Sequence, residues 1–354
     1  MFDLKNDDEA LMLLSAIGMN WADWPAISKL GGARVILNSP HVERLISANQ
    51  ALAKPLDNLR SKLDSFYERA GFLLSPQSWS GSRLARVSKA PLVFWGRGQA
   101  HILKNLPMVA IVGSRKADND GLKESFKLAQ VLASHGISIV SGGALGVDSA
   151  AHQGSLAGGT YTVVVSGLAC SWVHDERPAH IAGLASDRHC VLYPYGPTTP
   201  QGKFMFVERN RYVVALADAV VIVQGQEGSG TVHSARFAKS HNIPLFAIPG
   251  SRNNPLSLVP NQLIAAQQAS AVVDFEQFAR LLMTKTAKPH KKQAKNPVEL
   301  PPILQLIKEH KALTMGEISI LSGQSLLALQ QEMLEYEMEG LVLKQGPQFV
   351  LPAN

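Results

Sequence analysis

From about residue 89 onward, hydrophobic positions form short continuous runs that are rich in valine and isoleucine and alternate with longer amphipathic stretches. Such runs are typical of parallel strands covered on both faces, and the stretches between them are typical of crossover helices. The pattern therefore predicts an α/β domain over residues 89–283, built on a Rossmann-like, doubly wound parallel sheet. Strands are expected at Met108–Val112, Ile137–Val140, Tyr161–Val165, Ala219–Val223 and Pro244–Ile248, and helices near Leu122–Ser134, Val147–Ala157, Val207–Ala217 and Val232–His241.

The two ends of the chain have other patterns. In residues 1–88, leucine and isoleucine recur every three or four positions, and scattered prolines and glycines interrupt them, which predicts a domain of short helices. Residues 284–298 are rich in lysine and proline and read as a linker. Residues 299–354 predict a small winged-helix module, with helices at Pro302–His310, Met315–Ser322 and Leu326–Glu339 and a hairpin around Gly346.

Composition restricts the function only weakly. Of the 354 residues, 46% are hydrophobic and 18% are charged, which is typical of a globular protein with a buried core. The net charge is +6, but five lysines between Lys285 and Lys295 account for most of it, so charge alone is poor evidence for nucleic acid. An acidic start and the lack of a long apolar run lead us to expect a cytoplasmic protein with no membrane partner.

The candidate chemistry lies in loops that follow the predicted strands. Ligands of open α/β sheets bind at the carboxyl ends of the strands. Glycines there let the backbone approach a ligand, and free N–H groups at a helix start attract anions. Arginine, lysine and hydroxyl side chains in the same loops predict an anion-binding rim, most simply for phosphates. The candidate residues are Gly113, Ser114, Arg115, Lys116, Gly142, Gly143, Gly146, Arg209, Asn210, Arg211, Ser229, Gly230 and Thr231.

Enzymatic motifs are not found. The first loop lacks GxGxxG, and neither GxxxxGK[ST] nor GxSxG occurs, so no cofactor is expected. Asp148 and His152 lie four positions apart on a predicted helix, which favours a capping carboxylate over a catalytic pair. Cys170 and Cys190 form no CxxC pair, and the histidines lack metal-ligand spacing, so no metal site is expected.

Five motifs in a fixed order are recognisable together. They are Val109–Arg115, Val140–His152, Arg209–Arg211, Gly228–Thr231 and Phe246–Gly250. In sequence and spacing they resemble the core signature of the DNA-processing protein A (DprA/Smf) family. The resemblance is detailed from about residue 90 to residue 275, and in architecture it extends over the whole chain.

The resemblance implies a function without catalysis. Members of that family bind single-stranded DNA, often as homodimers through the Rossmann-like domain, and help to load the RecA recombinase during natural transformation, the uptake of DNA in competence. Ser114, Arg115 and Lys116, with the loop Gly142–Gly146, would bind strand phosphates. Arg209 and Arg211, with Ser229 and Thr231, would complete the rim of that pocket.

The chain departs from the family pattern at several places, including the stretch Ser166–Arg188 and Leu192, where a glutamate is common. Leu145 stands where the family usually has arginine. In the N-terminal helical domain, Ile17–Asn20 is similar to a helix-hairpin-helix turn but has Asn20 where a second glycine is common.

Two other functions remain open. The loop at Gly228–Thr231 is similar to the PGGxGTxxE loop of phosphoribohydrolases, but Ser234 stands at the position of the catalytic glutamate. A nucleotide sensor or regulator could instead use the winged helix to read duplex DNA. Against that function, the expected recognition helix Leu326–Glu339 has four glutamates and neither arginine nor lysine.

Overall fold

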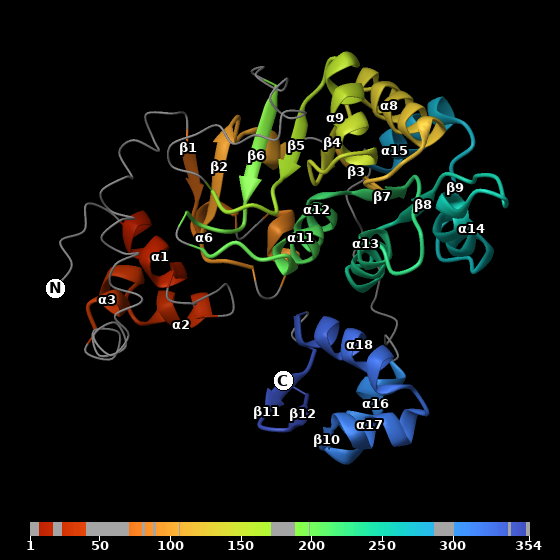
Figure 1. Ribbon diagram of the computed structural model, residues 1–354. Helices are drawn as coiled ribbons and strands as arrows, with labels where there is room; N and C mark the ends of the chain where they lie inside the picture. Colours follow the sequence, from red (N-terminus) through yellow and green to blue (C-terminus); the bar gives the residue numbers. More distant parts are fainter. Residues whose placement is uncertain are drawn as a thin grey trace. The chain divides into compact units, whose positions relative to one another are not determined.

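A computed structural model describes residues 7–16, 23–39, 71–79, 82–87, 90–105, 107–170, 188–197, 199–286, 301–338 and 341–351. The chain divides into two compact units, Met1–Arg86 with Ala90–Lys288, and Val87–Lys89 with Pro289–Asn354. The first unit contains the α/β fold and the N-terminal helices, and the second contains the C-terminal helices and hairpin (Figure 1).

The first unit is built on a sheet whose nine described strands run in the order β1-β2-β6-β5-β4-β3-β7-β8-β9. The strands from β6 to β9 are parallel to their neighbours, whereas β1 and β2 form an antiparallel edge beside β6. The five predicted strands are confirmed, and β1, β2, β6 and β9 extend the sheet on both sides of them. The bounds are β1 Gly71–Leu74, β2 Phe94–Gly98, β3 Met108–Val112, β4 Ser138–Ser141, β5 Thr162–Val165, β6 His189–Tyr193, β7 Ala219–Ile222, β8 Leu245–Ala247 and β9 Ser270–Ala271.

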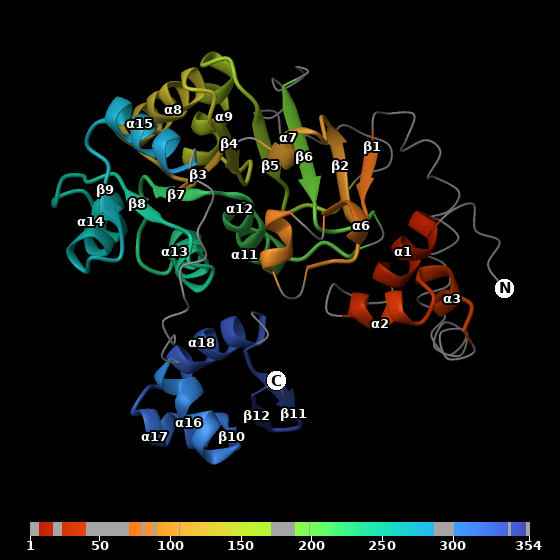
Figure 2. The same cartoon turned by 180° about the vertical axis from the view of Figure 1, so that it is seen from behind.

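Helices cover both faces of this sheet (Figures 1 and 2). On one face α8, α9 and α15 share a hydrophobic core with Val109 and Ile111 of β3, and on the other α12 and α13 pack against the central strands. Every residue of β3 is buried, as expected for a central strand covered on both sides. The described helices that follow β1 in this unit are α6 Pro76–Trp79, α7 Ile102–Asn105, α8 Asn119–Ser134, α9 Val147–Ala157, α11 Phe204–Glu208, α12 Asn210–Leu216, α13 Gly230–Ser240, α14 Leu258–Ala265 and α15 Phe275–Thr286, with 3-10 turns η2 Arg83–Arg86 and η3 Pro255–Ser257.

The strand order reverses direction at β3. From β3 the chain adds β4, β5 and β6 on one side, and after α11 and α12 it returns to place β7 on the other side of β3. A reversal of this kind leaves a crevice at the carboxyl ends of the two central strands, which is where open α/β sheets bind their ligands. The doubly wound, Rossmann-like fold is therefore confirmed. The predicted helix at Val207–Ala217 is two helices, α11 and α12.

The N-terminal helices pack on the antiparallel edge of the sheet. The helices α1 Asp7–Ala16, α2 Trp24–Lys29 and α3 Ala33–Leu37 share a hydrophobic core with Leu92 and Trp95. Short helices were predicted here. The turn Ile17–Asn20, and the leucines and isoleucine predicted as helical at positions 45–63, lie outside the described residues.

In its described residues, the C-terminal unit has three helices and a three-stranded antiparallel sheet of order β10-β12-β11 around one hydrophobic core. Thr314 caps α17 with a capping box, in which its hydroxyl accepts from the N–H of Glu317 while the Glu317 carboxylate accepts from the N–H of Thr314. The predicted helices and hairpin lie where they were expected, and their assignment as a winged helix stays a prediction. Of the predicted linker 284–298, the first three residues belong to α15, and the rest lie outside the described residues. The bounds are α16 Pro302–His310, β10 Ala312–Thr314, α17 Met315–Ser322, α18 Leu326–Met338, β11 Leu343–Gln345 and β12 Gln348–Val350.

Candidate functional site

A cavity of about 920 Å³ lies where the strand order reverses. Its walls come from five segments, which follow β3, β4, β6, β7 and β8 in the sequence. Nine of the thirteen candidate residues line it, and Gly142, Gly143, Gly146 and Arg211 do not. The nine are Gly113, Ser114, Arg115, Lys116, Arg209, Asn210, Ser229, Gly230 and Thr231.

Three exposed cations line this cavity, Arg115, Lys116 and Lys203. The guanidinium carbon of Arg115 lies 5.4 Å from the centre of the Phe206 ring, which gives the flexible side chain a fixed neighbour. The Ser114 hydroxyl accepts a hydrogen bond of 3.0 Å from the N–H of Lys116 and so tightens the loop between them. Sequence reasoning missed Lys203, because the segment before α11 has no motif and only the fold brings it to the cavity.

The start of α13 supplies neutral donors. Ser229 precedes the helix in an extended conformation and makes no side-chain cap. The hydroxyls of Ser229 and Thr231 are buried and have no hydrogen-bond partner among the described residues. Asn210 fixes this helix start against α12 by donating to the carbonyl of Gly230 at 3.4 Å. Buried hydroxyls are rarely left unpaired, so their position at a helix N-terminus indicates an anionic ligand.

Arg209 lines the cavity, as expected, but its guanidinium is buried and paired instead of exposed at the rim. It is 3% exposed, and its Nη1 lies 3.7 Å from Oδ2 of Asp148 and donates to the carbonyl of Val165 at 3.3 Å. Asp148 in turn accepts from the N–H groups of Gly142 and Ala144 at 3.2 and 3.3 Å. The pair forms part of the cavity wall, with the positive charge of Arg209 neutralised from within the fold.

Burial dominates the electrostatics of this pair. It raises the pKa of the Asp148 carboxyl, while the charge of Arg209 and the loop amides act in the opposite direction. It also lowers the pKa of the Arg209 guanidinium, and the nearby charge of Arg115 adds to that effect. Two charges removed from water are costly and remain only because each stabilises the other.

Arg211 lies away from the cavity, so its expected place on the rim is wrong. It is 5% exposed, forms an ion pair with Glu208 and donates to the hydroxyl of Tyr212 at 2.8 Å. Glu208 also accepts a hydrogen bond of 2.8 Å from Tyr195, whose pKa is raised by burial and by the charge of Glu208. Tyr212 itself is 1% exposed and cannot stack on a ligand.

The glycines of the loop after β4 have structural roles. A Cβ on Gly142 would overlap the guanidinium of Arg209, and a Cβ on Gly146 would overlap the carbonyl oxygen of Ser114. Gly146 also has φ of +82°, and Gly143 has +68°. Gly146 thus lets the loop after β4 pack directly on the loop after β3, and Gly142 leaves room for Arg209. Leu145, where the resemblance implies an arginine, is 63% exposed.

Asp118 also lines the cavity and joins the loop after β3 to the segments after β7 and β8. Its carboxylate accepts from the N–H of Gly121 at 2.8 Å, from the amide of Gln224 at 2.8 Å and from the amide of Asn254 at 2.7 Å. These bonds, led by that of Gly121, hold the pKa of Asp118 below its ordinary value. Sequence reasoning missed this residue, since Gln224 and Asn254 are distant in the chain.

Groups with catalytic potential are structural. His152 shares a hydrogen bond of 2.7 Å with the hydroxyl of Thr162 inside the fold, and Asp148 accepts from the loop amides and pairs with Arg209. Burial raises the pKa of the Cys170 and Cys190 thiols to about 12. Within the described ranges, no cluster of three or more His, Cys, Asp or Glu is placed to hold a metal ion. Nor does any helix among them have the length and apolar character to cross a bilayer.

Fold and site together define a Rossmann-like protein with a cationic, hydroxyl-lined cavity at the switch point of its sheet. Residues 73–283, more than half of the chain, match the family described as DNA recombination-mediator protein A. The chain belongs to this family, which confirms the resemblance seen in the sequence motifs. The family consists of recombination mediators and not of enzymes.

Individual relatives agree with this assignment. The chain is 33% identical over 174 residues to the DNA processing protein DprA of Streptococcus pneumoniae, covering 49% of this chain and 61% of the relative. It is 26% identical over 262 residues to the protein Smf of Escherichia coli, covering 69% and 70%. The first of these relatives is thus matched over less than two thirds of its own length.

Solved structures show the same fold. The DprA structure from Streptococcus pneumoniae superposes with a TM-score of 0.56 at 27% identity, over 78% of this chain and 93% of that one. A DNA processing protein A from Helicobacter pylori, described for its single-stranded DNA binding mode, gives a TM-score of 0.54 at 29% identity, over 61% and 96%.

Proposed function

We propose that this protein binds single-stranded DNA in the cavity at the carboxyl ends of β3 and β7. In this role it protects incoming strands and helps to load the RecA recombinase during natural transformation or homologous recombination. Membership of the recombination-mediator family and the single-stranded DNA binding of the Helicobacter pylori relative support the proposal.

One observation carries the proposal. Exposed Arg115, Lys116 and Lys203 surround a helix start at which the hydroxyls of Ser229 and Thr231 lack partners among the described residues. No carboxylate in the described part of the chain forms an ion pair with these cations, and the hydroxyls are preformed neutral donors. Together they fit a phosphate better than a neutral ligand. The buried pair of Arg209 and Asp148 holds the loops in place and does not contact the strand as a free cation would.

The aromatic side chains favour a single strand over a duplex. Phe204 is 60% exposed, and Phe206 lines the cavity beneath Arg115. Unpaired bases stack on such rings, whereas bases inside a duplex are covered by their neighbours. A concave site with rings beside cations is suited to a flexible strand.

RecA loading and a homodimer through the Rossmann-like domain are the further parts of the proposal. Family membership supports both. Light scattering of the full chain tests the dimer. The rate at which RecA assembles on strands coated with a single-strand binding protein tests the loading, and a rate that this chain leaves unchanged would contradict it.

A phosphoribohydrolase activity is not supported. Ser234, at the position of the catalytic glutamate, is buried, and its hydroxyl donates to the carbonyl of Gly230 at 3.3 Å. A hydroxyl engaged in this way cannot act as the carboxylate acid or base that such hydrolysis needs.

Binding of fluorescent oligo-dT and of its duplex across a salt series tests the proposal. We expect the wild type to prefer the single strand, with log K falling by about 0.7 per neutralised phosphate per unit of log salt. Arg115→Ala should weaken binding to all sequences alike and reduce that slope. Arg280→Ala, which removes an exposed arginine of α15, is the matched control and should bind like the wild type. Equal affinity and slope for Arg115→Ala and wild type would remove this cavity from the proposal.

A further inference from the structure

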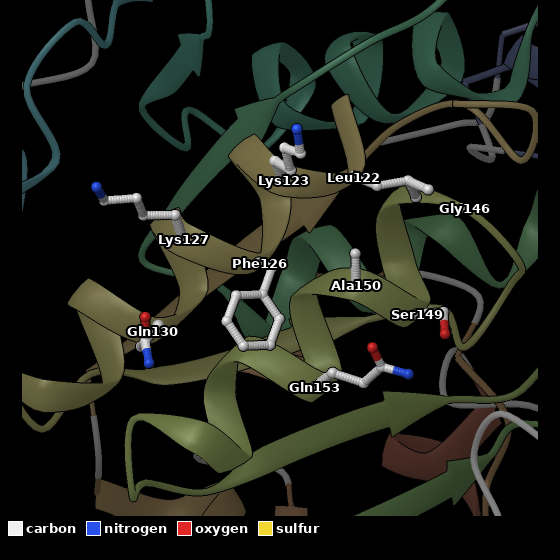
Figure 3. A pocket seen from close by; sticks show the side chains of 9 residues that line it. All are labelled: Leu122, Lys123, Phe126, Lys127, Gln130, Gly146, Ser149, Ala150 and Gln153. Atoms are coloured by element: carbon white, nitrogen blue, oxygen red, sulfur yellow. The ribbon is translucent and has the colours of Figure 1, made fainter. Parts of the chain in front are cut away.

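A second hollow lies between α8 and α9, beside the candidate site. Its volume is about 760 Å³, and the residues that line it are Leu122, Lys123, Phe126, Lys127, Gln130, Gly146, Ser149, Ala150 and Gln153 (Figure 3). None of the cations and hydroxyls assigned to phosphate binding above is among these residues. We call this hollow the α8–α9 groove.

The groove exists because the two helices approach closely along only part of their length. A Cβ on Gly154 of α9 would overlap the carbonyl oxygen of Phe126, and a Cβ on Gly158 would crowd the methyl of Ala133. Close packing at these glycines anchors the helices to each other. Toward the start of α9, the residues Gly146, Ser149 and Ala150 are small. Space therefore remains between them and Phe126.

The lining combines a ring with basic and amide side chains. Figure 3 shows the Phe126 ring between the two helices, with Lys123 and Lys127 extending outward from α8 and Gln153 on the side of α9. Both lysines are exposed, and none of the described residues lining the groove is acidic. Non-specific single-strand binding uses cations beside an accessible aromatic ring, the cations for phosphates and the ring for bases, and the half-buried Phe126 has such cations beside it.

The groove adjoins the candidate site through a shared wall. Gly146 lines the groove, and its backbone packs on the loop of Ser114 and Arg115, which lines the cavity. The N–H of Val147 donates to the carbonyl of Ser114 at 3.2 Å across the same contact. Leu145, in the loop next to this contact, is 63% exposed and offers an apolar surface beside the wall. A strand that leaves the cavity beside Arg115 therefore meets the α8–α9 groove next.

We propose that the α8–α9 groove binds the continuation of the same DNA strand, with Lys123 and Lys127 contacting phosphates and Phe126 stacking on a base. This inference rests on the proposed function, and it extends the site from a single cavity to a track. It predicts that affinity depends on strand length in a way that the cavity alone does not produce.

The test uses the full chain and a series of dT oligonucleotides from a few to about 30 nucleotides. For long strands, Lys123→Ala/Lys127→Ala should reduce the salt slope by about 1.4, the value for two lost phosphates. Phe126→Leu, which keeps an apolar side chain at a half-buried position, should bind long strands about tenfold more weakly. For the shortest strands, which fill the cavity alone, both variants should match the wild type.

The control is Lys29→Ala/Lys239→Ala, which removes the same charge from exposed positions on α2 and α13. Thermal unfolding of each variant shows whether a loss of binding reflects a loss of fold. Because Lys123 and Lys127 are exposed, their double variant tests the groove even if Phe126→Leu is unstable. If the control double variant and the groove double variant bind long strands equally, the groove is not part of the site. If the wild type binds no single strand of any length, the proposed function itself fails.

Discussion

The guanidinium of Arg209 occupies the space that a side chain on Gly142 would fill. The arginine comes from the segment between α11 and α12 and the glycine from the loop after β4, so the contact joins two walls of the cavity. Asp148 completes the arrangement by accepting from Gly142 and by neutralising Arg209. The shape of the site therefore depends on a buried ion pair and on the absence of one methyl group.

Gly142→Ala should destabilise the protein by about 1–3 kcal/mol, because the methyl group must displace a side chain fixed on several sides. Urea unfolding measures the change. Gly316→Ala is the matched control, since a Cβ there has no neighbour within 4 Å, and alanine inside α17 should be neutral or stabilising. Equal stabilities of the two variants would mean that Arg209 moves aside without cost.

Arg209→Leu should cost about 3–5 kcal/mol, because it leaves the Asp148 carboxylate buried without its countercharge. Adding Asp148→Asn should recover part of that loss, and a double-mutant cycle of unfolding free energies measures the coupling. Arg115→Ala should leave stability nearly unchanged while it weakens strand binding. If Arg209→Leu folded like the wild type and lost only binding, Arg209 would be a strand contact after all.

Thr231→Val should separate stability from binding. The Thr231 hydroxyl is buried without a partner among the described residues, so its removal should stabilise the free protein by about 1 kcal/mol or leave it unchanged. Strand affinity should fall severalfold, because the phosphate loses a donor. Thr162→Val provides the contrast, since that hydroxyl is bonded to His152 and should cost about 1 kcal/mol without affecting binding. An unchanged affinity in Thr231→Val would remove this hydroxyl from the site.

Asp118 should contribute to the acid sensitivity of the fold. Its pKa is lowered in the folded state, so the unfolded chain binds the proton more readily, and the stabilisation is complete above the ordinary pKa of 3.8 and lost as the pH falls below it. Asp118→Asn keeps a capping oxygen but removes the charge, and should cost about 1 kcal/mol at pH 7. Urea unfolding from pH 7 to pH 3 should show the two proteins converging. Parallel curves over that range would contradict the assignment.

Much of the fold could be read from the chain, because continuous valine and isoleucine runs have one stable use in a sheet covered on both faces. Met108–Val112 and the helix at Val147–Ala157 were predicted with the bounds that the structure has. The strand β1 was not predicted. The strand β2 lies within Pro91–Gly98, which resembles the family's lead-in strand, but its place in the sheet was not predicted, because an antiparallel edge is defined by its pairing partner. For β2 that partner is β6, about 90 residues later in the chain.

The candidate site, like the fold, could be predicted from the sequence only in part. Glycines, hydroxyls and cations after successive strands were sufficient to locate the cavity, because the carboxyl ends of parallel strands meet at one edge. The sequence alone also determined the family, through five motifs in register. Whether a cation is free to bind a ligand was decided only by the tertiary structure. Arg115 stays exposed, whereas Asp148 neutralises Arg209 from 61 residues away in the sequence. The physical reason is that a charge is set by its three-dimensional neighbours and its access to water, neither of which is encoded in local spacing.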